Sequence, residues 1–341
     1  MIKKNIKRLI LLLITMVFLY FVCRNVDLKQ LLYEMKSFDI KFIPFLIISI
    51  LTGLTMRGVC FKLLISKSVK APLSDMAPLC ITCAALNIFL PARAGDLFRA
   101  FYVGDKYKVD KIKMFGAIIL ERVFDGLVIL SLLLLAIFCY NNDDLARTLC
   151  LGAAAIFITC FILAILAIKF NKIDVICTWI EKKTDKFPNK LKNMISSVLG
   201  FVNKTCNSFI SGFEVLQYPK TLITVVLSSF SIWAFECLNH YLVIAGFNCN
   251  VDWSVVLFII PFISLACMIP STSIFIGPYQ FAILAAFAIY GVPKETALAI
   301  SIFEQTFVVI VSAVVAAIFL LKNNFNYKEI RQDVSNTLNN N

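Results

Sequence analysis

The chain has 341 residues, of which 60% are hydrophobic and only 16% are charged, against roughly 25% charged residues in an ordinary soluble protein. So little polar surface excludes a large cytosolic enzyme, a secreted disulfide scaffold and a nucleic-acid-binding domain, and it indicates a membrane protein with several spans. The net charge of +12 therefore reports orientation in the membrane and affinity for anionic lipid, and we expect no nucleic-acid partner.

Six segments are apolar enough to cross a bilayer, which takes about 20 residues per helix. In chain order they are 6–23, 40–65, 111–140, 146–168, 220–245 and 296–321. The first follows a basic N-terminus but lacks a cleavage site with small residues, so we expect an uncleaved span.

Two further apolar stretches, 76–104 and 252–291, are interrupted by proline and glycine at 91–95 and 270–278. Such breaks predict either a helical hairpin that returns to the side it entered or two tilted spans, because irregular backbone at membrane depth needs protein or water around it. The predicted fold is thus an all-α, polytopic helical bundle with about six full spans and two broken hairpins.

The distribution of basic residues predicts the orientation. With the N-terminus in the cytoplasm and both broken stretches as hairpins, 25 of the 33 lysines and arginines lie in cytoplasmic segments and 6 lie outside. We therefore expect a multi-pass protein of the cytoplasmic membrane with both termini in the cytoplasm. Residues 1–321 form one transmembrane domain, with a basic amphipathic connector at 169–219 on the cytoplasmic face and a polar tail at 322–341.

The two halves of the chain share a pattern. At an offset of 183 residues the long helices that follow the broken stretches align, matching Val109 with Val292, Lys111 with Lys294, Glu121 with Glu304 and Phe124 with Phe307. In the predicted topology the two hairpins enter from opposite sides, so the pseudo-repeats at about 40–140 and 220–321 form an inverted repeat, as in many transporters. Chance similarity between two apolar helices is the alternative.

Ionisable residues within spans are costly unless they face a partner or a watery cavity, so each is a candidate site residue. The richest group surrounds the first break and the helix after it: Arg93, Gly95, Asp96, Arg99, Glu121, Arg122 and Asp125. Guanidinium groups suit phosphate, and we expect Glu121 and Asp125 to hold Arg93 and Arg99 when no ligand is bound. The group is either a binding site for an anionic headgroup or a salt-bridge network that locks hairpin to helix, and the two roles are compatible.

A second set of polar residues predicts a pathway or a proton relay: Arg57, Glu236, His240, Glu304 and Gln305. For Arg57 the alternatives are snorkelling or pairing with an acid, and for the others interhelical hydrogen bonding. We expect no metal and no cofactor, because the chain has a single histidine, Cys80 and Cys83 form an isolated C-x-x-C motif, and no nucleotide-binding loop is present.

The sequences LPARAGDLFRA at 90–100 and ERVFDGL at 121–127, followed by Gly277-Pro278 and a second acidic helix, resemble the flippase-like transmembrane family. This is the domain that forms the N-terminal part of lysylphosphatidylglycerol synthases and also occurs alone. The resemblance implies a protein that moves or handles lipids with charged or glycosylated headgroups, with the seven residues around the first break as motif positions. The second half departs from the commoner pattern, because Ser271, Thr272 and Ser273 precede Gly277 in place of a glycine-rich stretch.

The leading functional hypothesis is a lipid translocase for phospholipids or polyprenyl-linked lipids with anionic or modified headgroups. The alternatives are a non-transporting membrane partner of a separately encoded synthase or glycosyltransferase and, less favoured, a membrane-embedded lipid-modifying enzyme. Because the chain ends soon after its last span, we expect no soluble aminoacyl-transferase domain and no synthesis of lysylphosphatidylglycerol. The expected partners are membrane lipids and such a synthase, and the sequence is compatible with a homo-oligomer.

Overall fold

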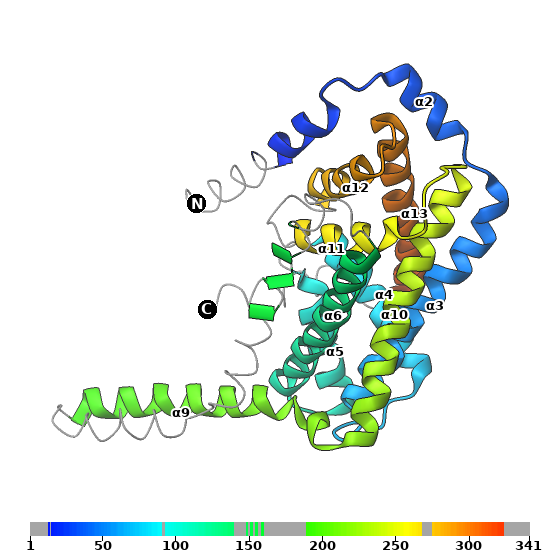
Figure 1. Cartoon of the computed structure of the whole chain (residues 1–341). Helices are drawn as coiled ribbons and strands as arrows, with labels where there is room; N and C mark the ends of the chain where they lie inside the picture. Colours follow the sequence, from blue (N-terminus) through cyan, green and yellow to red (C-terminus); the bar gives the residue numbers. More distant parts are fainter. Residues whose placement is uncertain are drawn as a thin grey trace.

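The computed structural model describes residues 13, 15–90, 93–139, 189–267 and 275–323, together with a few single positions between 148 and 159. Within these residues the regular structure is entirely helical (Figure 1). This confirms the predicted class, an all-α helical membrane protein.

The first half begins with helical residues 15–23 and continues through a short helix to a long one, a pair of shorter helices and a second long one. These are α2 (Leu28–Lys36), the 3₁₀ helix η1 (Ile40–Phe42), α3 (Ile43–Leu64), α4 (Leu73–Phe89), α5 (Ala94–Tyr107) and α6 (Lys111–Cys139). The second half contains α9 (Asn189–Ser211), η3 (Glu214–Gln217), α10 (Pro219–Gly246), α11 (Val255–Ala266), α12 (Pro278–Ile289) and α13 (Lys294–Lys322). Proline occupies the first turn of α3, α10 and α12, where its missing N–H costs no helical hydrogen bond.

Three described helices are long and apolar enough to cross a membrane: Ile40–Leu64, Pro219–Gly246 and Lys294–Lys322. They match the predicted spans at 40–65, 220–245 and 296–321. Helix α6 coincides with the predicted span at 111–140. The predicted span at 146–168 and the tail from 324 lie outside the described residues, apart from single positions in the former.

Helices α4 and α5 form an antiparallel hairpin around the first predicted break. Side-chain contacts join their facing turns in reverse order, pairing Asn87 with Asp96, Cys80 with Arg99, and Asp75 with Lys106. At about 1.5 Å per residue the 17-residue α4 and 14-residue α5 are about 25 and 21 Å long, shorter than the ~30 Å hydrocarbon core. The structure therefore favours a hairpin over two full spans.

Helices α11 and α12, each of 12 residues, also pack against each other, with the rings of Phe258 and Tyr290 6.0 Å apart. Residues 268–274, which contain the predicted break at Pro270 and the serine–threonine run, lie outside the described part of the chain. Gly277, the residue immediately before α12, has a φ of 98°, a value that glycine adopts readily.

The order of long helix, paired short helices and long helix thus occurs twice. The first long helices of the two halves, α3 and α10, lie side by side and run in opposite directions (Figure 1). As the residue number rises along the first helix, the number of its contact on the second falls. Asp39 N donates to Gly246 O at 2.8 Å, Gly53 faces Phe235, and Cys60 Sγ lies 3.6 Å from Ser229 Oγ. This antiparallel arrangement is what an inverted repeat requires, while the exact limits of the pseudo-repeats stay a prediction.

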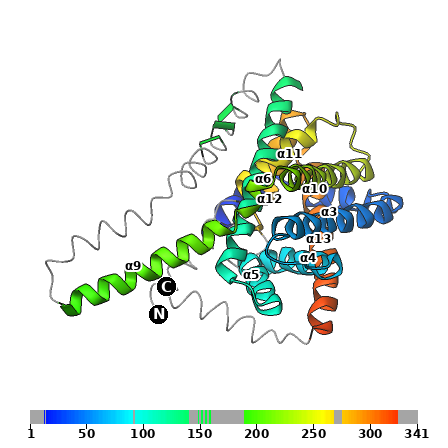
Figure 2. The ribbon, with the colours of Figure 1, turned by 90° about the horizontal axis from the view of Figure 1, so that it is seen from below.

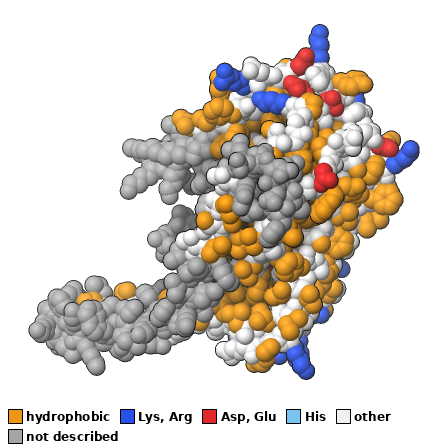
Figure 3. Space-filling view, in the orientation of Figure 1, with side chains coloured by type: hydrophobic (Ala, Val, Ile, Leu, Met, Phe, Trp, Pro, Cys, Tyr) orange, Lys and Arg blue, Asp and Glu red, His pale blue; other side chains and the backbone are white. Residues whose placement is uncertain are grey.

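Apolar side chains cover the flank of the bundle. On the spanning helices, large hydrophobic residues are exposed, including Phe45, Ile48, Ile223, Leu227 and Ile310, and Figure 3 shows a mostly hydrophobic band between charged side chains at top and bottom. Figure 2 shows α9, the described part of the predicted connector, projecting from the bundle. Its C-terminal end packs on α6, where Gly116 and Gly212 allow close approach of the two backbones.

Candidate functional site

The predicted motif residues come from the start of α5 and the middle of α6. Gly95 allows the hairpin to close, because a Cβ there would lie 2.1 Å from the carbonyl oxygen of Cys83 on α4. Arg93, immediately before α5, has a φ of 52°, a left-handed conformation that is unfavourable for residues other than glycine and often found at functional sites. The tight turn brings the first turns of α5 against α6.

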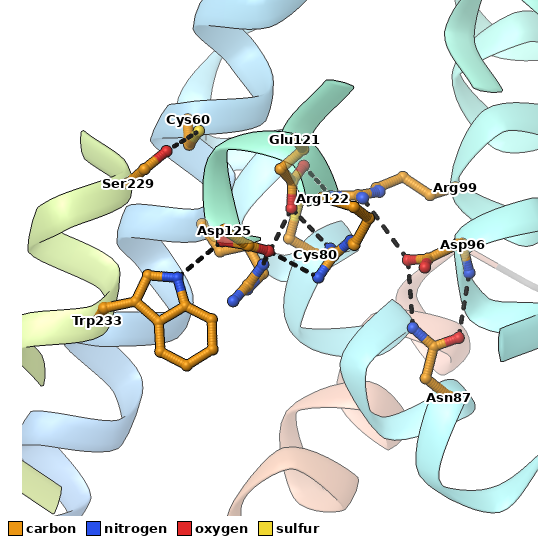
Figure 4. Close-up of polar contacts among 11 residues, drawn as sticks. Cys60, Cys80, Asn87, Asp96, Arg99, Glu121, Arg122, Asp125, Ser229 and Trp233 are labelled. Carbon is orange, nitrogen blue, oxygen red and sulfur yellow. Dashed lines mark hydrogen bonds and ion pairs between the residues drawn. The ribbon is translucent and has the colours of Figure 1, made fainter. Parts of the chain in front are cut away.

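Glu121 lies at the centre of the site and has no solvent exposure. Its carboxylate accepts hydrogen bonds from Arg57 Nη1 at 3.1 Å, Arg99 Nη1 at 2.9 Å and Arg122 Nη2 at 2.8 Å (Figure 4). One buried carboxylate therefore joins α3, α5 and α6.

Asp125, one turn further along α6, is 5% exposed and extends the network to α10. It accepts hydrogen bonds from Arg57 Nη1 at 3.0 Å, Arg122 Nη1 at 2.9 Å and Trp233 Nε1 at 2.9 Å. Because α10 belongs to the second half of the chain, this contact links the two halves at the site.

The hairpin side of the network centres on Arg99, which is 1% exposed. Arg99 Nη2 lies 3.6 Å from Asp96 Oδ1, and its guanidinium stacks 4.4 Å from the centre of the Phe61 ring. Asp96 and Asn87 exchange two hydrogen bonds of 3.2 Å, side chain to side chain and backbone to side chain. Each charge at this depth thus has polar or aromatic neighbours, as burial demands.

These ion pairs balance: the arginines Arg57, Arg99 and Arg122 face the acids Asp96, Glu121 and Asp125. The prediction that Glu121 and Asp125 hold Arg99 and Arg93 is confirmed for Arg99 and wrong for Arg93. Arg93 is exposed and forms no ion pair within the described part of the chain. The physical reason is that Arg93 lies in the turn before α5, in the wall of the cavities described next, while Arg57 of α3 reaches both acids.

Two adjoining cavities open beside the network, with volumes of about 300 and 280 Å³. They share Arg93, Arg122, Glu236 and Cys267 in their walls. The first is lined mainly by α6, α10 and α11, and the second is lined by α3, the α4–α5 hairpin and helices of the second half of the chain. These volumes lie at the lower end of those of small-molecule sites, a size that suits a polar headgroup.

Three guanidinium N–H groups at these cavities are buried and have no hydrogen-bond partner among the described residues. They are Arg99 Nε, Arg99 Nη2 and Arg122 Nε. Arg99 lines the second cavity and Arg122 lines both. Since buried donors rarely lack a hydrogen bond and arginine is a donor only, these groups are suited to donate to the oxygen of an anion.

The second set of predicted polar residues divides into two groups. His240 Nδ1 lies 2.6 Å from Glu304 Oε1, and His240 and Glu236 line the first cavity. Gln305 Oε1 instead accepts a hydrogen bond from Gln280 Nε2 of α12, so it joins α12 to α13.

Sequence reasoning missed Asn87 and Trp233. Both are uncharged, whereas the candidates were identified by charge within apolar segments. For Asn87 the available signal was a polar amide in an otherwise apolar helix. Cys80, interpreted as a small hydrophobe, lies 3.5 Å from Arg99 Nη1. Among the described residues, no group of three or more potential ligands is arranged to hold a metal ion.

Comparison with known proteins agrees with these features. The family described as lysylphosphatidylglycerol synthase TM region matches residues 8–319. A UPF0104 membrane protein of Methanocaldococcus jannaschii is 23% identical over 220 residues, which cover 64% of this chain and 85% of that protein. No solved structure matches the chain. The match over nearly all of its length shows that the chain belongs to the lysylphosphatidylglycerol synthase transmembrane-region family.

Proposed function

We propose that this protein translocates lipids with anionic, phosphate-bearing headgroups, either phospholipids or polyprenyl-linked lipids, across the cytoplasmic membrane. The observation that carries the proposal is the set of buried guanidinium N–H groups of Arg99 and Arg122 that have no hydrogen-bond partner among the described residues and border cavities in a bundle of membrane-spanning helices. A phosphate supplies the oxygen acceptors that these donors lack, and guanidinium matches its geometry.

Arg122 is the residue best placed to exchange partners. It is the arginine of the ionic network that lines both cavities, and its side chain is 29% exposed, whereas that of Arg99 is 1% exposed. A phosphate entering either cavity competes with Glu121 and Asp125 for Arg122, so the acids hold the arginine in the absence of lipid. Arg93, which has no ion pair among the described residues, adds positive charge at the wall that the two cavities share.

The shape of the surroundings supports a lipid over a small soluble anion. The first cavity has apolar walls of Ile129, Ile260 and Ile263 beside its charged residues. A headgroup pairs with the arginines while its chains lie against apolar surface, so neither part of the lipid is exposed to an unfavourable environment.

Movement of lipid by the purified protein tests the proposal. Vesicles of phosphatidylcholine and phosphatidylglycerol with a trace of NBD-phosphatidylglycerol receive external dithionite, which quenches only the outer leaflet. The protein should make the inner-leaflet probe accessible, and Arg122→Gln should slow this by about tenfold, the equivalent of one charge-assisted hydrogen bond. Lys204→Gln, which removes an exposed positive charge on α9, is the matched control. If Arg122→Gln moves the probe as fast as wild type, the assigned site is wrong.

A non-transporting partner of a lipid-modifying synthase is the second candidate, favoured by the family's name, which ties this region to such an enzyme. Its mark would be a protein that moves no probe in vesicles, co-purifies with a synthase, and changes that enzyme's turnover when added back.

The proposed orientation places both termini in the cytoplasm, with the start of α6 and the end of α9 on that side. A membrane-impermeant maleimide applied to whole cells should label Asn248→Cys, in the turn after α10, and should not label Lys204→Cys. Both variants carry Cys23→Ser, Cys206→Ser and Cys249→Ser, because Cys23 is exposed and the other two are partly exposed beside the introduced cysteines. The reverse labelling would overturn the orientation.

A further inference from the structure

The second half of the chain contains a buried acid–base pair that the proposed headgroup site does not use. His240, the single histidine of the chain, is 5% exposed on α10, and its Nδ1 lies 2.6 Å from Glu304 Oε1 of α13, which is 3% exposed. A contact this short places a proton between the imidazole nitrogen and the carboxylate oxygen within reach of both groups.

The groups that face this pair come from every side. Glu236 precedes His240 by one turn on α10 and lines both cavities, so it shares the helix face. Tyr279 of α12 interacts with Glu304. Across the first cavity lie Arg122 and Asp125 of α6, with Arg93 of the hairpin and Cys267 at the end of α11, and Arg57 of α3 lines the second cavity with Glu236.

The charge of the pair depends on one proton. With neutral His240 and ionised Glu304 the pair carries a charge of −1. With one proton added the pair is neutral, whether that proton is bound to His240 or to Glu304. His240 lines the same cavity, of about 300 Å³, as Arg122. An anionic headgroup held there by Arg122 is therefore close to the pair, and its negative charge favours the protonated state.

We propose that the His240–Glu304 pair binds a proton together with the anionic headgroup, so that lipid movement is coupled to a transmembrane proton gradient. This inference rests on the proposed translocation of phosphate-bearing lipids and adds the proton as its co-substrate. By linkage, the headgroup increases the affinity for the proton by the same factor as the proton increases the affinity for the headgroup. The lipid's charge of −1 and the proton's charge of +1 enter the site together, and no covalent bond changes.

Proton binding is tested first without transport. Because His240 is the single histidine, protein labelled with ¹⁵N-histidine gives one set of ring signals by NMR in detergent. Adding dioctanoyl-phosphatidylglycerol should raise the titration midpoint of His240 by on the order of one pH unit, the scale of interaction between neighbouring charges in a partly buried site. In Glu304→Gln this shift should fall to less than half. An equal midpoint with and without the lipid would overturn the coupling.

Transport under a pH gradient provides the second test, in the dithionite vesicles described above with the membrane potential clamped by potassium and valinomycin. A gradient of one pH unit should change the rate for wild type several-fold, and Glu304→Gln should move lipid at a rate that the gradient does not alter. Ser312→Ala is the matched control: Ser312 is buried on the same helix but donates to the backbone of α13, so it should keep the gradient dependence. If wild type moves lipid equally with and without the gradient, the coupling is wrong and translocation stands; if it moves no lipid, both proposals fall.

Discussion

Replacing Glu121 by glutamine is the sharpest test of the central network. The carboxylate is fully buried and accepts hydrogen bonds from Arg57, Arg99 and Arg122 at 2.8–3.1 Å. Glutamine keeps the shape but removes one negative charge and directs an N–H₂ group toward the guanidiniums, leaving three arginines against two acids. Removing one partner of a buried ion pair costs about 3–5 kcal/mol, and three lost charge-assisted contacts favour the upper part of that range.

Thermal unfolding followed by a thiol-reactive fluorophore measures this cost, because Cys60, Cys80 and Cys83 are buried and react when the bundle opens. A loss of this size should lower the melting temperature by on the order of 10 °C, given roughly 2–4 °C per kcal/mol in chains of 150–250 residues. Adding Arg99→Met to Glu121→Gln restores the charge balance and should recover at least part of the loss, since apolar replacement of a buried pair is often neutral. A melting temperature unchanged in the single variant, or a double variant less stable than the sum of both changes, would refute the assignment of Glu121 as the centre of the network.

Three further changes test other parts of the structure. Gly95→Ala places a Cβ 2.1 Å from a backbone carbonyl oxygen of α4, so it should destabilise the hairpin by about 3 kcal/mol or more in the same unfolding assay. Trp233→Phe removes the 2.9 Å hydrogen bond to Asp125 and should cost about 1.5–3 kcal/mol, whereas Trp253→Phe, at an exposed position, should cost little. Asp110 is subject to partial burial, which raises its pKa, but hydrogen bonds from a serine of α9 and from the first turn of α6 outweigh this and hold the pKa below its usual value. Asp110→Ala should therefore lose about 1 kcal/mol at neutral pH, and this difference from wild type should shrink as the pH falls below about 4, as measured by denaturant unfolding across pH.

The spans and the first hairpin were predictable because bilayer thickness and backbone satisfaction constrain them strongly. A run of more than about 20 apolar residues in a membrane protein is nearly always a spanning helix. For the stretch broken by proline and glycine at 91–95, two arrangements remained, a hairpin or two tilted spans. The clustering of Asp96, Arg99, Glu121 and Arg122 followed for the same reason, since charges within spans must find partners.

The partner of each charge was not predictable, because it depends on how helices cross. Arg57 was a residue with two interpretations, and its position opposite both acids follows from the packing of α3 against α6. Arg93 has the same side chain but belongs to the turn before α5, and no sequence pattern separates the two cases. The cavities themselves are lined by side chains of seven described helices, so their size and shared wall exist only in three dimensions.

The equal number of positive and negative charges in the central network has an electrical consequence. Moving one elementary charge across the membrane potential changes the energy by about 2.3 kcal/mol per 100 mV. Arg57, Arg99 and Arg122 against Asp96, Glu121 and Asp125 sum to zero, so a displacement of the whole network does no net work against the field. The framework that holds the headgroup therefore adds no voltage dependence of its own to transport.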